Sequence, residues 1–78
     1  MDAFAVVERI FCDLFELEKG ALTLSTSRQQ IAGWDSVAHL KLLLMLEEEG
    51  ISLDPDEAIS LASVGDVVAA VERQRNQG

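Results

Sequence analysis

The sequence has one cysteine and few basic residues, and these shortages exclude several classes of protein. Because Cys12 is the only cysteine, the chain can form no internal disulfide and no cysteine cluster for zinc. Six Lys and Arg residues against fourteen Asp and Glu residues give a formal net charge of −8, whereas binding to phosphate backbones requires a basic surface. We therefore expect no nucleic-acid partner and no membrane partner. With no signal peptide in the sequence, we expect a reducing, cytoplasmic location.

Long hydrophobic runs are also missing, and the chain is short. No wholly apolar run is longer than that of residues 42–46, which cannot cross a bilayer, because a span takes about 20 apolar residues. A chain of 78 residues has room for one domain, 1–78, and excludes a multidomain enzyme. A domain of this size buries only about 60–65% of its unfolded surface, so we expect its function to lie on the surface.

The sequence contains no internal repeat, no low-complexity tract and no strand-like alternation, whereas helical spacing recurs along most of its length. Four helices are predicted, at about 3–17, 36–49, 55–61 and 64–73. Residues 21–34 show no sustained period and form a connection longer than most in compact domains. The predicted fold class is all-α: a four-helix bundle with a long loop between the first two helices and a short third helix.

Local signals place the ends of the first two helices. Gly20, after Lys19, is expected to close the first helix as the residue with positive φ. Asp35 is a favoured N-cap and starts the second helix at Asp35 or Ser36. Gly50 is expected to end that helix. Its apolar sector is wider than a surface helix needs, so some of its leucines must stay near the surface.

The third and fourth helices carry start signals of the capping-box type. Asp54 reads as an N-cap, with Pro55 at the first helical position and Glu57 completing a reciprocal box. Ser63 and Asp66 repeat the pattern before the fourth helix. Its valines recur on one face, at positions 64, 67, 68 and 71, which predicts the side that packs on the core.

Ser36 is the first candidate for function. It follows a capping residue, comes at the end of a long polar loop and opens a helix whose first amides are unpaired. Such a helix start favours a phosphate by about 0.3–1 kcal/mol. The plain alternative is that serine is simply common in the first helical turn.

Three other candidates carry less chemistry. His39 lies one turn after Ser36, but side chains at this spacing seldom align for proton transfer, so we expect a packed or hydrogen-bonded histidine. A calcium loop starting at Asp54 fails because Ile59 and Gly65 stand where glycine and glutamate are needed. Cys12 is expected to be a small buried hydrophobe. We therefore expect no catalytic residue and no metal site.

The order of these motifs resembles an acyl carrier protein over nearly the whole chain. The resemblance rests on Gly-Trp-Asp-Ser-Val at 33–37, the leucine run at 42–46, Glu-Glu-Glu-Gly-Ile at 47–51, Asp-Pro-Asp-Glu at 54–57 and Ser-Val-Gly-Asp at 63–66. It implies that Ser36 carries 4′-phosphopantetheine, transferred from coenzyme A by a separate Mg²⁺-dependent transferase. It also implies that the chain is not an enzyme. Asp35 would cap the helix and help the transferase to place its metal.

The resemblance further implies a docking surface on the exposed side of the second helix. Residues 35–57 hold seven acids and one base, and this field favours basic patches on partner enzymes; a solvated acidic face is the plain alternative. The expected partners are the phosphopantetheinyl transferase, acyl- or aminoacyl-loading enzymes and downstream synthases, and we expect a monomer. Trp34 is read as a hydrophobic staple or as a contact for partners. The predicted docking surface is made of Trp34, Val37, Leu40, Lys41, Leu44, Met45, Glu47 and Glu48.

Three residues depart from the family's common pattern: Val37 for Leu, Lys41 for an acid and Gly50 for Phe. Lys41 puts in doubt that the chain serves the partners of a typical fatty-acid carrier. The Gly-Trp-Asp-Ser segment followed by His-Leu resembles discrete carriers of bacterial polyketide, nonribosomal and related pathways. Primary fatty-acid synthesis and an unmodified acidic helical adaptor are the alternatives.

Overall fold

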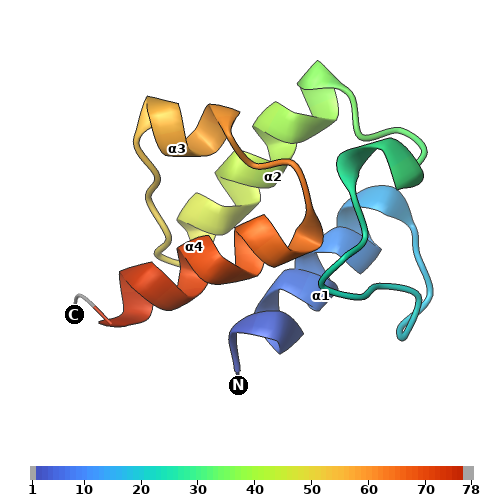
Figure 1. Cartoon of the computed structure of the whole chain (residues 1–78), viewed down its shortest axis with the longest axis horizontal. Helices are drawn as coiled ribbons and strands as arrows, with labels where there is room; N and C mark the ends of the chain where they lie inside the picture. Colours follow the sequence, from blue (N-terminus) through green and yellow to red (C-terminus); the bar gives the residue numbers. More distant parts are fainter. Residues whose placement is uncertain (1, 77–78) are drawn as a thin grey trace.

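The computed structural model describes residues 2–76 and confirms the all-α class. Figure 1 shows the four helices, with the long connection between α1 and α2 lying over one end of the molecule. Within residues 2–76 there is no strand, only one isolated antiparallel bridge between Ser27 and Ser63. None of the described helices is long and apolar enough to cross a membrane. The elements are α1 (Ala3–Phe15), a 3₁₀ helix (Arg28–Gln30), α2 (Ser36–Glu48), α3 (Pro55–Ile59) and α4 (Val64–Asn76).

The end of α1 differs from the prediction. The helix stops at Phe15 and is closed by Glu16 in the left-handed conformation with φ 56°; Gly20 has the expected positive φ, 94°, but lies beyond the end of the helix. The amide of Leu17 then donates to the carbonyl of Cys12 at 3.2 Å, which closes the helix. Leu17 packs against the core. The partial burial of Leu17 therefore explains why Glu16 takes a left-handed conformation that glutamate does not itself favour.

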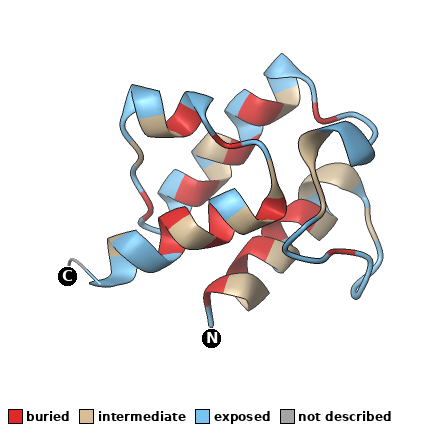
Figure 2. Ribbon diagram, viewed as in Figure 1, coloured by how far each residue is buried: buried red, intermediate tan, exposed pale blue. Residues whose placement is uncertain are grey.

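One hydrophobic core joins α1, α2 and α4, and Figure 2 shows the buried residues on the facing sides of these helices. Phe11 is fully buried at its centre, and its ring meets the edge of Trp34 at 5.2 Å between centroids. The predicted apolar face of α4 is confirmed, because all four of its valines are buried. The largest fully buried side chains are Phe11, Leu42, Leu46, Val7, Val64, Val67 and Val71.

α2 begins and ends on the predicted signals. Gly50 has φ 82° just after the helix, which ends at Glu48, one residue before the predicted 49. The Gly50 amide donates to the carbonyl of Glu47 at 2.9 Å, and the Ile51 amide donates to the carbonyl of Leu46 at 2.9 Å. This pair of bonds is a Schellman motif, and it turns the buried Ile51 back onto the core.

α3 is capped by Asp54, whose carboxylate accepts from the amide of Glu57 at 2.8 Å. The predicted reciprocal box is wrong at this site, because the Glu57 side chain instead accepts from Arg73 of α4 at 2.7 Å. The helix ends at Ile59 rather than at 61, whereas α4 runs to Asn76, beyond the predicted 73. The ion pair with Arg73 thus links the short α3 to α4.

The connection between α1 and α2 is tied to the start of α4. The Arg28 amide donates to the carbonyl of Ala62 at 2.8 Å, and the Gly65 amide donates to that of Leu24 at 2.9 Å. Ser63 caps α4 by accepting from the Asp66 amide at 3.1 Å. The Asp66 carboxylate accepts from the Ala62 amide at 2.9 Å, whereas a reciprocal capping box would have it accept from the amide of Ser63. The loop predicted over 21–34 is therefore held in place, and it includes a 3₁₀ helix.

Candidate functional site

Ser36 is the first residue of α2, and its side chain is exposed. Asp35 is the N-cap, as predicted: its carboxylate accepts from the Ala38 amide at 2.9 Å, and its carbonyl accepts from the His39 amide at 2.8 Å. No group in residues 2–76 forms a hydrogen bond with the Ser36 hydroxyl. This hydroxyl therefore lies at the protein surface without a competing partner.

The backbone around Ser36 offers donors to an anion. The amides of Ser36 and Val37 belong to the first turn of α2, where no carbonyl of the helix can accept from them. α2 has 13 residues, so its aligned peptide dipoles add partial positive charge at this end. A phosphodiester on the Ser36 hydroxyl would thus meet unpaired donors and a favourable field.

Trp34 and His39 form a buried pair behind this helix start. The Trp34 indole N–H donates to Nδ1 of His39 at 2.9 Å, and Nε2 of His39 bonds the carbonyl of Ala58 in α3 at 2.8 Å. Because Nδ1 accepts, the neutral ring carries its proton on Nε2 and donates to Ala58. The rings lie 6.0 Å apart at 17°, so Trp34 packs on the fourth residue of α2 as the predicted staple does.

The buried Trp34–His39 pair tests the predictions made for these two residues. Trp34 is only 5% exposed, so its assignment to the docking surface is wrong: Phe11, Phe15 and His39 pack around the indole. His39 is 9% exposed and both its ring nitrogens are engaged, which confirms the packed histidine. A Ser36–His39 nucleophilic pair is excluded because no nitrogen of the ring is left to accept the serine proton.

Arg28 supports the loop before Ser36, and sequence patterns gave no signal for this role. Its Nε donates to the carbonyl of Trp34 at 3.2 Å, while its guanidinium carbon lies 5.9 Å from the centre of the indole ring. Arg28 belongs to the 3₁₀ helix, and its side chain is half-buried. The arginine therefore fixes the backbone immediately before Asp35 by a hydrogen bond and a cation–π contact.

The outer face of α2 exposes an apolar stripe beside charged residues. Val37 and Leu40 are each 62% exposed and Leu44 is 60% exposed. Exposure of three large apolar side chains on one helix is unusual, because contact of apolar surface with water is unfavourable. This result confirms that the leucines of α2 are too many for the core alone. Of the other residues predicted for the docking surface, Lys41, Glu47 and Glu48 are exposed and Met45 is half-buried against the core.

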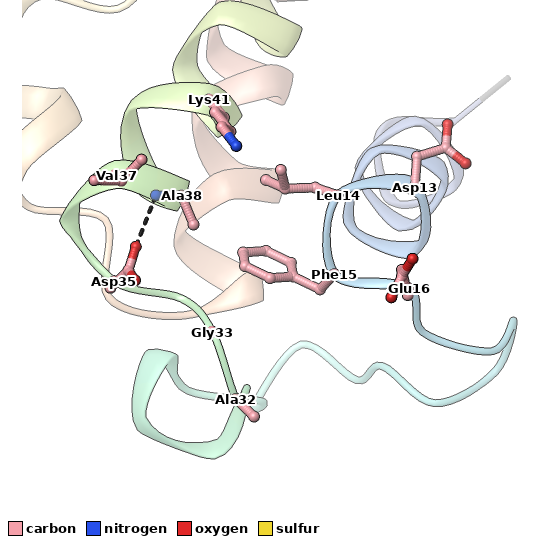
Figure 3. A pocket seen from close by; sticks show the side chains of 10 residues that line it. All are labelled: Asp13, Leu14, Phe15, Glu16, Ala32, Gly33, Asp35, Val37, Ala38 and Lys41. Atoms are coloured by element: carbon pink, nitrogen blue, oxygen red, sulfur yellow. Dashed lines mark hydrogen bonds between the residues drawn. The ribbon is translucent and has the colours of Figure 1, made fainter.

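A groove of about 420 Å³ lies between the end of α1 and the start of α2. Figure 3 shows Leu14 and Phe15 pointing from α1 towards α2, with Lys41 of α2 extending over the same space. The sequence did not predict this groove, because its two walls lie more than 15 residues apart in the chain. It is lined by Asp13, Leu14, Phe15, Glu16, Ala32, Gly33, Asp35, Val37, Ala38 and Lys41.

Cys12 of α1 lines a second hollow of about 510 Å³. It is half-buried rather than buried as predicted. Burial raises the pKa of the Cys12 thiol, and the negative charges of Glu8 and Asp13 raise it further, so the thiolate is disfavoured. Within residues 2–76, no group of three or more His, Cys, Asp or Glu side chains could hold a metal ion.

Comparison with known sequences places the chain among carriers of a prosthetic group. Residues 5–71 match the family described as "Phosphopantetheine attachment site". The acyl carrier protein of Lactobacillus acidophilus is 29% identical over 72 residues, which cover 91% of this chain and 90% of that protein. The acyl carrier protein of Exiguobacterium sibiricum is 32% identical over 69 residues, which cover 87% of each.

A solved structure agrees with the fold as well as with the sequence. The solution NMR structure of holo acyl carrier protein from Geobacter metallireducens superposes with a TM-score of 0.86 at 29% identity. The superposition covers 99% of this chain and 90% of that one. The match therefore includes the long connection between α1 and α2 and the short α3, and is not limited to two or three helices.

Proposed function

Because the chain belongs to the acyl carrier protein family, whose members are carriers and not catalysts, we propose that Ser36 is the residue that bears its 4′-phosphopantetheine. The observation that carries this proposal is the exposed, unpartnered Ser36 hydroxyl at the start of α2. The unpaired amides of Ser36 and Val37 supply donors that suit the phosphodiester. When attached, the arm supplies a terminal thiol that holds acyl groups as thioesters.

Asp35 has two roles in this proposal. Its carboxylate caps α2 through the Ala38 amide, which fixes the position of Ser36 at the first turn. One carboxylate oxygen makes this bond, and the residue itself is exposed. The remaining lone pairs are therefore open to solvent and suit the placement of the transferase's Mg²⁺ during modification.

We propose a docking surface that consists of Val37, Leu40, Lys41, Leu44, Met45, Glu47 and Glu48, without the buried Trp34. Family membership implies contacts with a phosphopantetheinyl transferase and with synthase enzymes. An exposed apolar stripe next to Glu47 and Glu48 fits an enzyme surface with an apolar patch rimmed by basic residues. Carrier and partner should associate faster at low salt, because the acidic field of residues 35–57 attracts such a rim.

The class of pathway is a separate proposal. Lys41 in the docking surface favours partners other than those of a typical fatty-acid carrier, and we propose polyketide- or nonribosomal-type biosynthesis in the cytoplasm. Primary fatty-acid synthesis is the alternative, because the relatives carry only the general name of acyl carrier protein. Mass spectrometry of the thioester on protein isolated from its host would separate an aminoacyl or ketide cargo from a saturated fatty acyl chain.

Modification of the apo protein tests the attachment residue. We expect coenzyme A, Mg²⁺ and a broad-specificity transferase to add one pantetheinyl mass to the wild type and none to Ser36→Ala. Ser52→Ala is the matched control, because Ser52 is also exposed but lies outside α2; it should be modified like the wild type. Modification of Ser36→Ala would refute the attachment residue. An unmodified wild type would favour an acidic adaptor instead.

A further inference from the structure

All charged residues on and just after α2 are acidic except one. Between residues 35 and 57 there are seven acids and one base, a net charge of −6 out of −8 for the whole chain. The base is Lys41, which is exposed. It lies one turn after Val37 and one turn before Leu44, so the three side chains share the outward side of α2. A cation therefore stands within the apolar stripe of an otherwise acidic surface.

Lys41 forms no ion pair with any residue of the described range 2–76. Three carboxylates of residues 35–57 are committed to other partners: Asp35 caps α2, Glu49 pairs with Arg9, and Glu57 pairs with Arg73. Figure 3 shows the Lys41 side chain extending over the groove between α1 and α2. Its ammonium is thus presented to a binding partner and is not used to hold the fold.

We propose that Lys41 is a specificity-determining residue of the docking surface, a step that rests on the proposed carrier function. It favours partner enzymes that place a carboxylate opposite α2 within an otherwise basic rim. It weakens association with enzymes whose rim is basic throughout. The groove beside Lys41 also holds the carboxylates of Asp13, Glu16 and Asp35, so the partner's acidic side chain would have to meet the ammonium on the outer side of α2 and not inside the groove.

The physical reason is the desolvation of a charge at an interface. When a partner covers the stripe of Val37, Leu40 and Leu44, the ammonium of Lys41 loses water and must meet either a carboxylate or a like charge. A carboxylate restores a charge-assisted hydrogen bond. A lysine or arginine opposite it adds repulsion at reduced dielectric, which discriminates between partners. Glu47 and Glu48 on the same helix still attract basic residues, so the preferred rim has mixed charge.

Charge reversal at Lys41 tests this with a transferase whose carrier-binding surface is uniformly basic. We expect Lys41→Glu to raise kcat/KM for modification roughly tenfold at low salt, a difference that one repulsive contact can supply. The gain should shrink as salt rises from about 0.05 M to about 0.3 M, where charges are screened within about 6 Å. Lys41→Met, which removes the charge alone, should give a smaller gain.

Lys19→Glu is the matched control, since it makes the same change in net charge outside the docking surface, beyond the end of α1. We expect it to alter kcat/KM by less than about twofold. An equal gain from both variants, or no gain from Lys41→Glu, would overturn the proposal. Absence of modification in every form would instead contradict the proposed carrier function and favour an acidic adaptor, so the two failures are distinguishable.

The partner side supplies the complementary test. Basic residues of the transferase surface are replaced one at a time by Glu and assayed against the wild type and Lys41→Glu. We expect at least one replacement to reverse the order, so that the wild-type carrier becomes the better substrate. Such a reversal measures a direct coupling between the two side chains. If every replacement leaves Lys41→Glu ahead, Lys41 does not select for an acidic residue.

Discussion

The indole N–H of Trp34 donates to Nδ1 of His39 at 2.9 Å, and the far side of the same ring bonds the carbonyl of Ala58 at 2.8 Å. One histidine thus joins three segments: the loop before Ser36, the first turns of α2, and α3. Since α3 has only five residues, it cannot hold its place by its own helical bonds. The start of α2 and the position of α3 therefore depend on the same side chain.

His39→Ala should destabilise the protein by about 2–4 kcal/mol, because it opens a cavity and leaves the Trp34 N–H and the Ala58 carbonyl without partners. Urea unfolding followed by circular dichroism measures the change. Leu40→Ala, one residue along the same helix but 62% exposed, should cost less than about 1 kcal/mol and serves as the control. Equal losses from the two variants would contradict a bridging role.

Local signals in the sequence predicted a large part of this arrangement. Asp35, Asp54 and Gly50 take the predicted capping positions, because a short carboxylate or a glycine satisfies the end of a helix using atoms close in sequence. The exposed leucines of α2 were also predicted, since the apolar sector exceeded what one core face can bury. Features that depend on residues close together in the chain can therefore be predicted from the residue types.

Features that depend on distant residues were not predicted. The left-handed turn at Glu16 follows from the packing of Leu17 on the core, which overrides the preference of glutamate. Glu57 gives its carboxylate to Arg73, sixteen residues away, instead of completing its own capping box. The support of Trp34 by Arg28 and the groove between α1 and α2 likewise require the assembled fold. No local pattern in the sequence encodes these pairings.

Gly65 allows the loop between α1 and α2 to approach α4 closely. A Cβ at this position would lie 2.7 Å from the carbonyl oxygen of Leu24, the same atom that accepts from the Gly65 amide. Gly65→Ala should therefore destabilise the protein by about 1–3 kcal/mol, although alanine is the better helix former by about 1 kcal/mol. Thermal and urea unfolding check the sign. Glu72→Ala, exposed on the same helix, should be close to neutral; a stabilised Gly65→Ala would show that the loop yields.

The Cys12 thiol should react slowly with iodoacetamide in the folded protein. Burial, then the charges of Glu8 and Asp13, raise its pKa above the ordinary value of 9.0, so less thiolate is present at a given pH than in the unfolded chain. Because the folded pKa is the higher one, this thiol's stabilising contribution is complete below the unfolded pKa and is lost as pH rises through the folded pKa. Alkylation rates near pH 9, with and without urea, test this expectation.

Two variants sharpen the test of Cys12. Asp13→Asn removes a charge that raises the pKa and should speed alkylation of the folded protein, whereas Glu72→Gln on α4 should not. In unfolding experiments, Cys12→Ser should remove the share of the alkaline loss of stability that comes from this thiol. Alkylation of the native chain as fast as that of the urea-unfolded chain would contradict the raised pKa.

Asp35 offers a way to separate the capping role from the role in metal placement. Asp35→Ala should cost about 0.5–2 kcal/mol of stability, because the Ala38 amide loses its acceptor. Asp35→Asn should retain most of that stability, since asparagine is an equally good N-cap, but it removes the charge. If the carboxylate helps to place Mg²⁺, both variants should slow transfer of the pantetheinyl group, and Asp35→Asn should need more Mg²⁺ to reach half its maximal rate. A normal rate and Mg²⁺ dependence in Asp35→Asn would leave capping as the only function of this residue.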